Sequence, residues 1–143
     1  MKKYQLPASL EGSCTQTAYE KWLRGRAAAH RKHDPKRFGI QPESGEAYRL
    51  KIHQAVIESK GYDVYTGEKL DWSLLSTYDN TKAKNGGWQY KHGFALLPSV
   101  DHDRNVDGSY TFRICGWRTN DCKSSLSLSE LFTFCEAILA KRK

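Results

Sequence analysis

The strongest constraint on the fold of this 143-residue chain is the alternation of apolar and polar residues in its C-terminal part. The segment FALLPSVDH (94–102) is typical of an apolar strand, and YTFRICGW (110–117) alternates with the period of a half-buried strand. Asp107-Gly108 between them favours a turn. We therefore expect a two-stranded hairpin, in which Pro98 makes the first strand an edge strand or a bulged one.

Helical patterns follow the hairpin. RTNDCKSSL (118–126) predicts a short helix, and Ser127 with Glu130 has the spacing of a capping box. An apolar stripe then recurs at helical spacing, which predicts a last helix that packs in the core. The stripe consists of Leu128, Leu131, Phe132, Cys135, Ile138 and Leu139. The expected fold class is therefore α+β.

The N-terminal region, residues 1–60, is expected to be helical and basic. Capping-type residues and helix formers predict a helix from residue 14 that ends at His33-Asp34-Pro35, because proline restricts the residue before it. A second helix is predicted in 43–61, with Gly61 as its C-terminal cap.

The middle of the chain shows weaker patterns. YDVYTGEKLDW (62–72) predicts a hairpin or tight turn around Thr66-Gly67, and residues 76–93 are polar and glycine-bearing, which favours a long exposed loop. The length of the chain favours a single domain, residues 1–143.

The charge and the cysteines limit the class of partner. Lys and Arg number 23 against 16 Asp and Glu, a net charge of +7, which favours a polyanion such as nucleic acid or an anionic membrane. No run approaches the roughly 18 apolar residues of a membrane span, and the first residues lack a secretory signal, so we expect a cytoplasmic protein without a membrane partner.

The four cysteines of the chain form no Cys-x-x-Cys pair, so no structural zinc is expected.

The first predicted helix is the most basic part of the chain. Its Lys and Arg side chains, which alternate with the aromatic residues Tyr19 and Trp22, are interpreted as an arm that contacts phosphates. For any single residue, a charged face exposed to solvent is an equal alternative. The candidate residues are Arg24, Arg26, Arg31 and Lys32.

Asp101, His102 and Asn120 are polar residues on successive predicted elements. Successive side chains diverge at a strand end, so Asp101 can face the following helix while His102 points outward. Two hard oxygen ligands, from Asp101 and Asn120, suit Mg²⁺, and the imidazole can then take a proton from water. An ordinary Asp-His turn with Asn120 as a helix N-cap is the competing interpretation.

The motifs VDHDRN (100–105), DGSYTFRICGW (107–117) and TNDCKSSLSLSELFTFCEAIL (119–139) make residues 61–143 resemble the HNH endonuclease superfamily. The resemblance implies a ββα-metal core, with additional N-terminal helices and a C-terminal packing helix. It implies Asp101 and Asn120 as ligands of one Mg²⁺, Mn²⁺ or other divalent cation, and His102 as general base. The family's zinc-binding cysteine pairs are absent.

The remaining motif positions have supporting roles in this interpretation. Lys123 is expected to hold phosphate or orient the helix, and Arg104 and Arg118 are further candidates for phosphate contacts. The family's middle asparagine corresponds to Thr111, which is therefore the candidate for positioning the base.

The functional hypothesis is a metal-dependent endonuclease that hydrolyses DNA phosphodiester bonds with water activated by a general base. A single such site cuts one strand, so double-strand cutting would require a homodimer or sequential nicking. A nucleic-acid-binding module without turnover and a ribonuclease or toxin acting on RNA are the alternatives.

Overall fold

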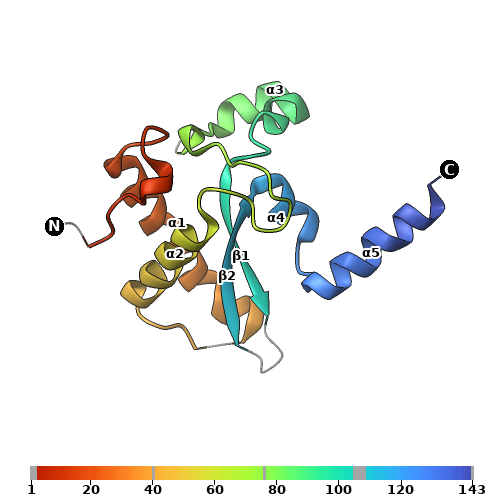
Figure 1. Cartoon of the computed structure of the whole chain (residues 1–143), viewed down its shortest axis with the longest axis horizontal. Coiled ribbons are helices and arrows are strands. Elements are labelled where there is room, and N and C mark those ends of the chain that lie inside the picture. The colour runs from red at the N-terminus through yellow and green to blue at the C-terminus, as the bar shows by residue number, and fades with distance from the viewer. Residues whose placement is uncertain (1–2, 40, 76, 105–108, 143) are drawn as a thin grey trace.

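The structure, a computed structural model, describes residues 3–39, 41–75, 77–104 and 109–142. These residues form a mixed α+β fold in which helices surround a two-stranded antiparallel sheet (Figure 1). The elements are α1 (Gln16–Phe38), α2 (Gly45–Ser59), α3 (Asn80–His92), β1 (Pro98–Arg104), β2 (Tyr110–Gly116), α4 (Trp117–Lys123) and α5 (Leu128–Lys141), with short 3-10 helices at Ala8–Leu10 and Trp72–Leu74.

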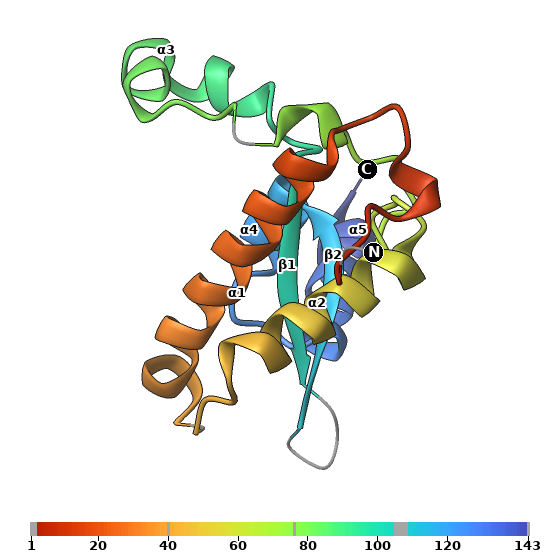
Figure 2. The same cartoon turned by 90° about the vertical axis from the view of Figure 1, so that its left-hand side faces the viewer.

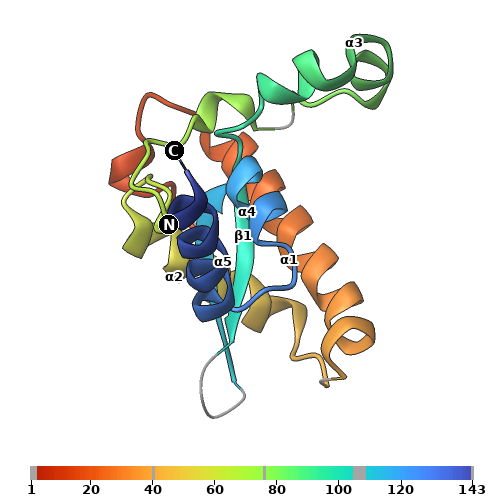
Figure 3. The same cartoon turned by 90° about the vertical axis from the view of Figure 1, so that its right-hand side faces the viewer.

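The predicted hairpin is present as β1 and β2. Its register pairs His102 with Phe112 and Asp101 with Arg113, and Pro98 is the first residue of β1, where a missing amide donor is tolerated. The predicted turn at Asp107-Gly108 lies outside the described residues. Helices α1 and α2 lie on one face of the hairpin, and α4 lies on the other (Figures 2 and 3).

Helix α1 continues through Pro35 to Phe38, so the predicted end at His33-Asp34-Pro35 is wrong. Asp34, the residue that proline disfavours in a helix, is held by contacts of its own: its carboxylate accepts a hydrogen bond from the Tyr48 hydroxyl at 2.8 Å. The helix ends at Gly39, which has a φ of 65° and donates its amide to the Pro35 carbonyl. Tertiary contacts of Asp34 therefore override a local preference.

Two further predictions concern turns. The tight turn at Thr66-Gly67 is confirmed, because the Gly67 amide donates to the Asp63 carbonyl at 2.8 Å and Gly67 has a φ of 77°. Helix α2 is confirmed as well, but its left-handed capping residue is Lys60, one position before the predicted Gly61.

The segment predicted as a long exposed loop instead contains α3. Asp79 caps this helix by accepting hydrogen bonds from the Thr81 and Lys82 amides, and Gly87 interrupts it with a φ of 59°. Most of its side chains are exposed, which explains why no apolar stripe marks it in the sequence.

The core lies where α1 and α2 meet the hairpin. Tyr19 and Trp22 of α1 pack near Trp72, and Ile52 and Val56 of α2 are fully buried within the same cluster. Within the described residues, no helix combines the length and the apolar character that crossing a bilayer requires.

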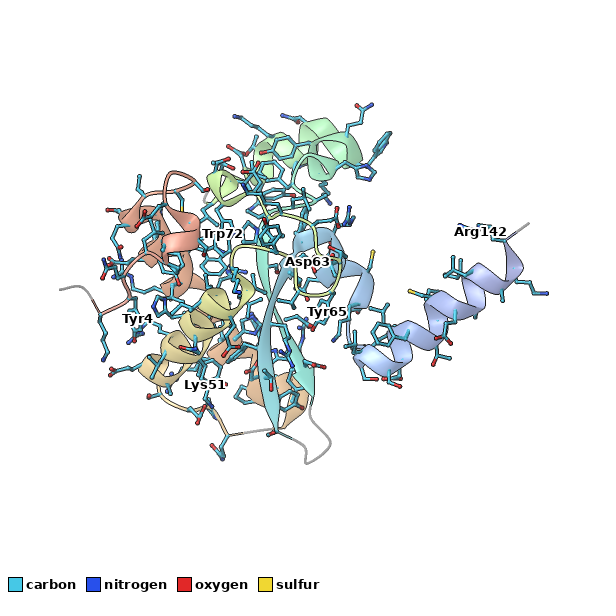
Figure 4. The ribbon with its side chains drawn as sticks, viewed as in Figure 1. Tyr4, Lys51, Asp63, Tyr65, Trp72 and Arg142 are labelled. Carbon is cyan, nitrogen blue, oxygen red and sulfur yellow. The ribbon has the colours of Figure 1, made fainter. Side chains whose placement is uncertain are left out.

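Helix α5 begins with the predicted capping box, in which Ser127 and Glu130 bond reciprocally. The prediction that it packs in the core is wrong: it contains no buried residue, and the side chains of Phe132 and Ile138 are each 56% exposed. The helix extends away from the body, with Arg142 near its far end (Figure 4). Its apolar periodicity therefore reports an amphipathic helix, but not a buried one.

We expect the substitution Phe132→Ser in α5 to change the free energy of unfolding by less than about 0.5 kcal/mol, because the ring has no core contacts to lose. The comparison variant Ile52→Ala, at a position with 0% exposure, should cost about 2–5 kcal/mol. Urea unfolding of both variants measures these changes. A loss of several kcal/mol in Phe132→Ser would contradict this placement of α5.

Candidate functional site

Four of the site residues predicted from the sequence line one cavity, which has a volume of about 450 Å³. It lies beside β1, between the C-terminal half of α1 and the α4–α5 connection. Asp101, His102, Asn120 and Lys123 all contribute to its wall, and His30 and Arg37 contribute from α1. The fold therefore gathers residues of α1, β1 and α4 around one space.

The pleat of β1 sends its two adjacent candidate residues to opposite faces of the hairpin. The expectation that His102 points outward is wrong: it faces α1, its side chain is 7% exposed, and its ring contacts Phe38 and Phe112 at centroid distances of 5.3 and 4.8 Å. Asp101 faces α4, where its carboxylate meets Lys123. The cavity at the edge of β1 is open to both side chains.

The His102 imidazole is held by a buried carboxylate. Its Nε2 lies 2.9 Å from Oδ2 of Asp34, and the two side chains are 7% and 2% exposed. A carboxylate can only accept hydrogen bonds, so this contact requires a proton on Nε2, and the neutral tautomer that has it keeps the lone pair on Nδ1. The Tyr48 hydroxyl donates to the same Oδ2 and fixes the carboxylate.

His30, one turn before Asp34 on α1, packs against the same ring. The centroids of the His30 and His102 rings are 4.5 Å apart. Burial, with a smaller effect of His102, lowers the pKa of His30 from 6.5 to about 4, although Asp34 acts in the opposite direction. His30 is therefore neutral at physiological pH.

Asp101 is neutralised by a buried ammonium group. Its Oδ2 lies 3.0 Å from Nζ of Lys123 and accepts a hydrogen bond from the Tyr65 hydroxyl at 2.8 Å. Burial, with the adjacent Asp101 charge, raises the pKa of Tyr65 above its ordinary value, so the phenol remains a donor. Lys123, which the sequence interpretation assigned to phosphate or helix orientation, is thus the partner of Asp101.

Asn120 lies in the second turn of α4, so it is not the N-cap of that helix; Gly116 occupies this position. Its amide nitrogen donates to Oγ of Ser99 at 3.1 Å, which leaves the carboxamide oxygen outside that bond. Asn120 and Asp101 share the wall of the cavity, but the described residues show no hydrogen bond between them.

The start of α4 is fixed from outside the hairpin by Asp63 (Figure 4). Its Oδ2 accepts hydrogen bonds from the Gly116 amide at 2.8 Å and from the Thr119 hydroxyl at 2.7 Å. Its Oδ1 accepts the amides of Tyr65 and Thr66. One buried carboxylate thus sets the position of both Asn120 and Tyr65.

Thr111 does not lie where the sequence interpretation requires. It is paired with Asp103, one position from the His102–Phe112 pair, so the pleat places its side chain on the face opposite the imidazole. The positioning contact to His102 comes from Asp34 instead.

The residues of the predicted basic arm lie on different sides of α1. Each residue advances about 100° around a helix, so Arg24 and Arg26 point in different directions. Arg24 lines a separate pocket with Glu20 and Arg49, whereas the charge of Arg26 acts on His30. Arg31 donates to the Glu43 carbonyl at 2.8 Å.

The other cationic candidates also differ. Lys32 is exposed, Arg118 forms an ion pair with Glu68, and the side chain of Arg104 lies outside the described part of the chain. Arg37, which the sequence interpretation did not choose, lines the cavity.

Sequence reasoning missed Asp34, His30 and Tyr65 as members of the site. His30 and Asp34 are four residues apart on a predicted helix, so they share one face of it. This spacing is the sequence feature that could have indicated a common site. Their meeting with His102, 68 residues later than Asp34, depends on the packing of α1 against the hairpin.

Comparisons of the chain with models of protein families, with curated proteins and with solved structures found no match.

The lowered pKa of His30 predicts a pH-dependent stability. The folded-state pKa of about 4 lies below the ordinary 6.5, so between these values the unfolded chain binds more protons and acid favours unfolding. Because His30 takes up a proton in the unfolded chain but not in the folded one, we expect it to make the free energy of unfolding about 2 kcal/mol lower at pH 5 than at pH 7. Urea titrations at both pH values, with a chelator present, measure this decrease. The variant His30→Gln should lose about 2 kcal/mol less than the wild type between pH 7 and pH 5. An equal decrease in both proteins would contradict the lowered pKa of His30.

Proposed function

We propose that the chain is a metal-dependent endonuclease of the HNH type that hydrolyses phosphodiester bonds of DNA. The observation that carries the proposal is the shared cavity of about 450 Å³, in which Asp101, His102, Asn120 and Lys123 meet. The consecutive order of β1, β2 and α4 supports the assignment of these elements as a ββα-metal core.

His102 acts as the general base in this proposal. Asp34 keeps the proton on Nε2, so the Nδ1 lone pair is available to take a proton from water. The imidazolium that forms is stabilised by the Asp34 carboxylate, which already lies 2.9 Å from Nε2. A positioned base of this kind contributes on the order of 10²–10⁴ in rate.

Asp101 and Asn120 would hold the divalent cation. They fit one because a carboxylate and a carboxamide, both hard oxygen donors, line the same cavity, and because Asp101 already attracts the cationic Lys123. When bound, Mg²⁺ or Mn²⁺ supplies electrostatic stabilisation of charge on the phosphate oxygens. A cation held by Asp101 would share that carboxylate with Lys123, whose ammonium group also lines the cavity and could contact phosphate there.

The surface charge is consistent with a polyanionic substrate. Arg37 and Lys123 line the cavity, and the chain carries a net charge of +7. The exposed Arg26 and Lys32 of α1 extend this positive charge beyond the cavity. Because a site built around the phosphate does not itself read the sugar, parallel digestion of DNA and RNA, with Mg²⁺, Mn²⁺ or chelator, tests the substrate class.

We expect His102→Ala to abolish nicking of supercoiled plasmid while most of the affinity for DNA remains. The reason is that the substitution removes the proton acceptor but leaves the cations in place. Gel assays of nicking and fluorescence anisotropy with labelled duplex measure the two quantities. Cleavage at the wild-type rate by a clean preparation of this variant would remove His102 as the base.

We expect Asp34→Asn to lower the cleavage rate by about ten-fold to a hundred-fold, because a carboxamide can donate to Nε2 and so stabilise the wrong tautomer. Its pH–rate profile should also change, since the imidazolium loses its carboxylate partner. The matched control is Asp103→Asn, a carboxylate next to His102 in β1 that pairs instead with Arg113. An unchanged pH profile, or an equal effect in the control, would argue against a positioning role for Asp34.

A further inference from the structure

A second group of potential metal ligands lies on the α1 side of the hairpin. His30, Asp34 and His102 each offer a ligand atom, and these atoms lie within 4.8 Å of one another. The shortest separation is 2.9 Å, between Nε2 of His102 and Oδ2 of Asp34, and Nδ1 of His30 lies 3.9 Å from Oδ1 of Asp34. None of the three belongs to the Asp101–Asn120 pair.

These separations are close to those of a metal centre. Bonds of about 2.0–2.1 Å in tetrahedral geometry place neighbouring ligand atoms about 3.3 Å apart. His30 and Asp34 are four residues apart on α1 and therefore share one face of the helix. The separations of 2.9 and 3.9 Å bracket that spacing, and all three ligand atoms lie within 4.8 Å of one another.

Neighbouring groups also orient these ligand side chains, as is common for metal ligands. The Tyr48 hydroxyl donates to the Asp34 carboxylate at 2.8 Å, and the His30 and His102 rings pack with their centroids 4.5 Å apart. Both imidazoles line the cavity, which provides a route for an ion and space for a water molecule or other fourth ligand.

We propose that His30, Asp34 and His102 bind a transition-metal dication of the Zn²⁺ class. Two imidazoles and one carboxylate suit Zn²⁺, Co²⁺ or a similar ion, whereas Mg²⁺ prefers oxygen ligands of the kind that Asp101 and Asn120 offer. The two sides of the hairpin therefore differ in the metal that they select.

Metal binding at this site would switch off the base. A neutral imidazole has one lone pair; when Nε2 donates it to the metal, the ring proton resides on Nδ1, and no nitrogen remains to accept a proton from water. This consequence rests on the proposed nuclease function, whereas the binding of the metal does not. Micromolar Zn²⁺ is thus expected to inhibit cleavage supported by millimolar Mg²⁺.

The first experiment titrates the full chain with Co²⁺ and follows its visible ligand-field absorption. We expect one equivalent to bind, and His30→Ala to weaken binding by at least about ten-fold through the loss of a ligand. The matched control is His33→Ala, an exposed histidine on the same helix. Equal affinity in wild type and His30→Ala, or an equal loss in His33→Ala, would overturn the site.

Thiolates also bind Co²⁺, so a second control replaces the exposed Cys122 and Cys135 by serine. This double variant is expected to keep the signal, and loss of the signal would assign it to the cysteines and overturn the proposal. Histidine-ring NMR of the wild-type chain with Zn²⁺ needs no substitution. The resonances of His30 and His102 should shift, and those of His33, His53 and His92 should not; the reverse pattern would also overturn the site.

The nuclease assay separates the two proposals. Zn²⁺ inhibition that is weakened in His30→Ala would support both the site and its consequence. Metal binding without inhibition would support the site but contradict the role of His102 in cleavage. Absence of binding in a chain that still cuts DNA would overturn the site alone.

Discussion

The arrangement depends on one buried carboxylate, that of Asp34. Its Oδ2 receives the Tyr48 hydroxyl of α2 and faces Nε2 of His102 in β1, so three elements converge on a single oxygen atom. Each partner would be left buried without a hydrogen bond if the carboxylate were removed, at a cost of about 1–3 kcal/mol per group. This contact also explains why α1 continues through Pro35, since the end of the helix must carry Asp34 to the hairpin.

The pleat of β1 then creates two chemically different sides. On the α1 side, an imidazole is oriented by a carboxylate; on the α4 side, the Asp101 carboxylate is compensated by Lys123. Asp63 fixes the second side by binding both Gly116 and Thr119 at the start of α4. The buried carboxylates of Asp34, Asp63 and Asp101 thus each have hydrogen-bond or ion-pair partners, and Asp101 and His102 both line the cavity at the edge of β1.

Local patterns in the sequence predicted the elements better than their partners. The alternation in 110–117 and the capping box at Ser127 each have a local cause, and both are present. The position of α5 was not predictable, because an apolar stripe does not specify what covers it. The contact of Asp34 with His102 and that of Lys123 with Asp101 were missed for a similar reason, because each joins segments that are distant in the sequence.

In the proposed mechanism, Asp34 keeps the His102 proton on Nε2 and leaves Nδ1 as the proton acceptor. Nitrogen-15 NMR of the histidine rings at neutral pH, in the presence of chelator and with His102 assigned by substitution, reports this tautomer directly. We expect a protonated Nε2 and a pyridine-like Nδ1 for His102. A protonated Nδ1, or averaged signals from a ring that exchanges between tautomers, would contradict it.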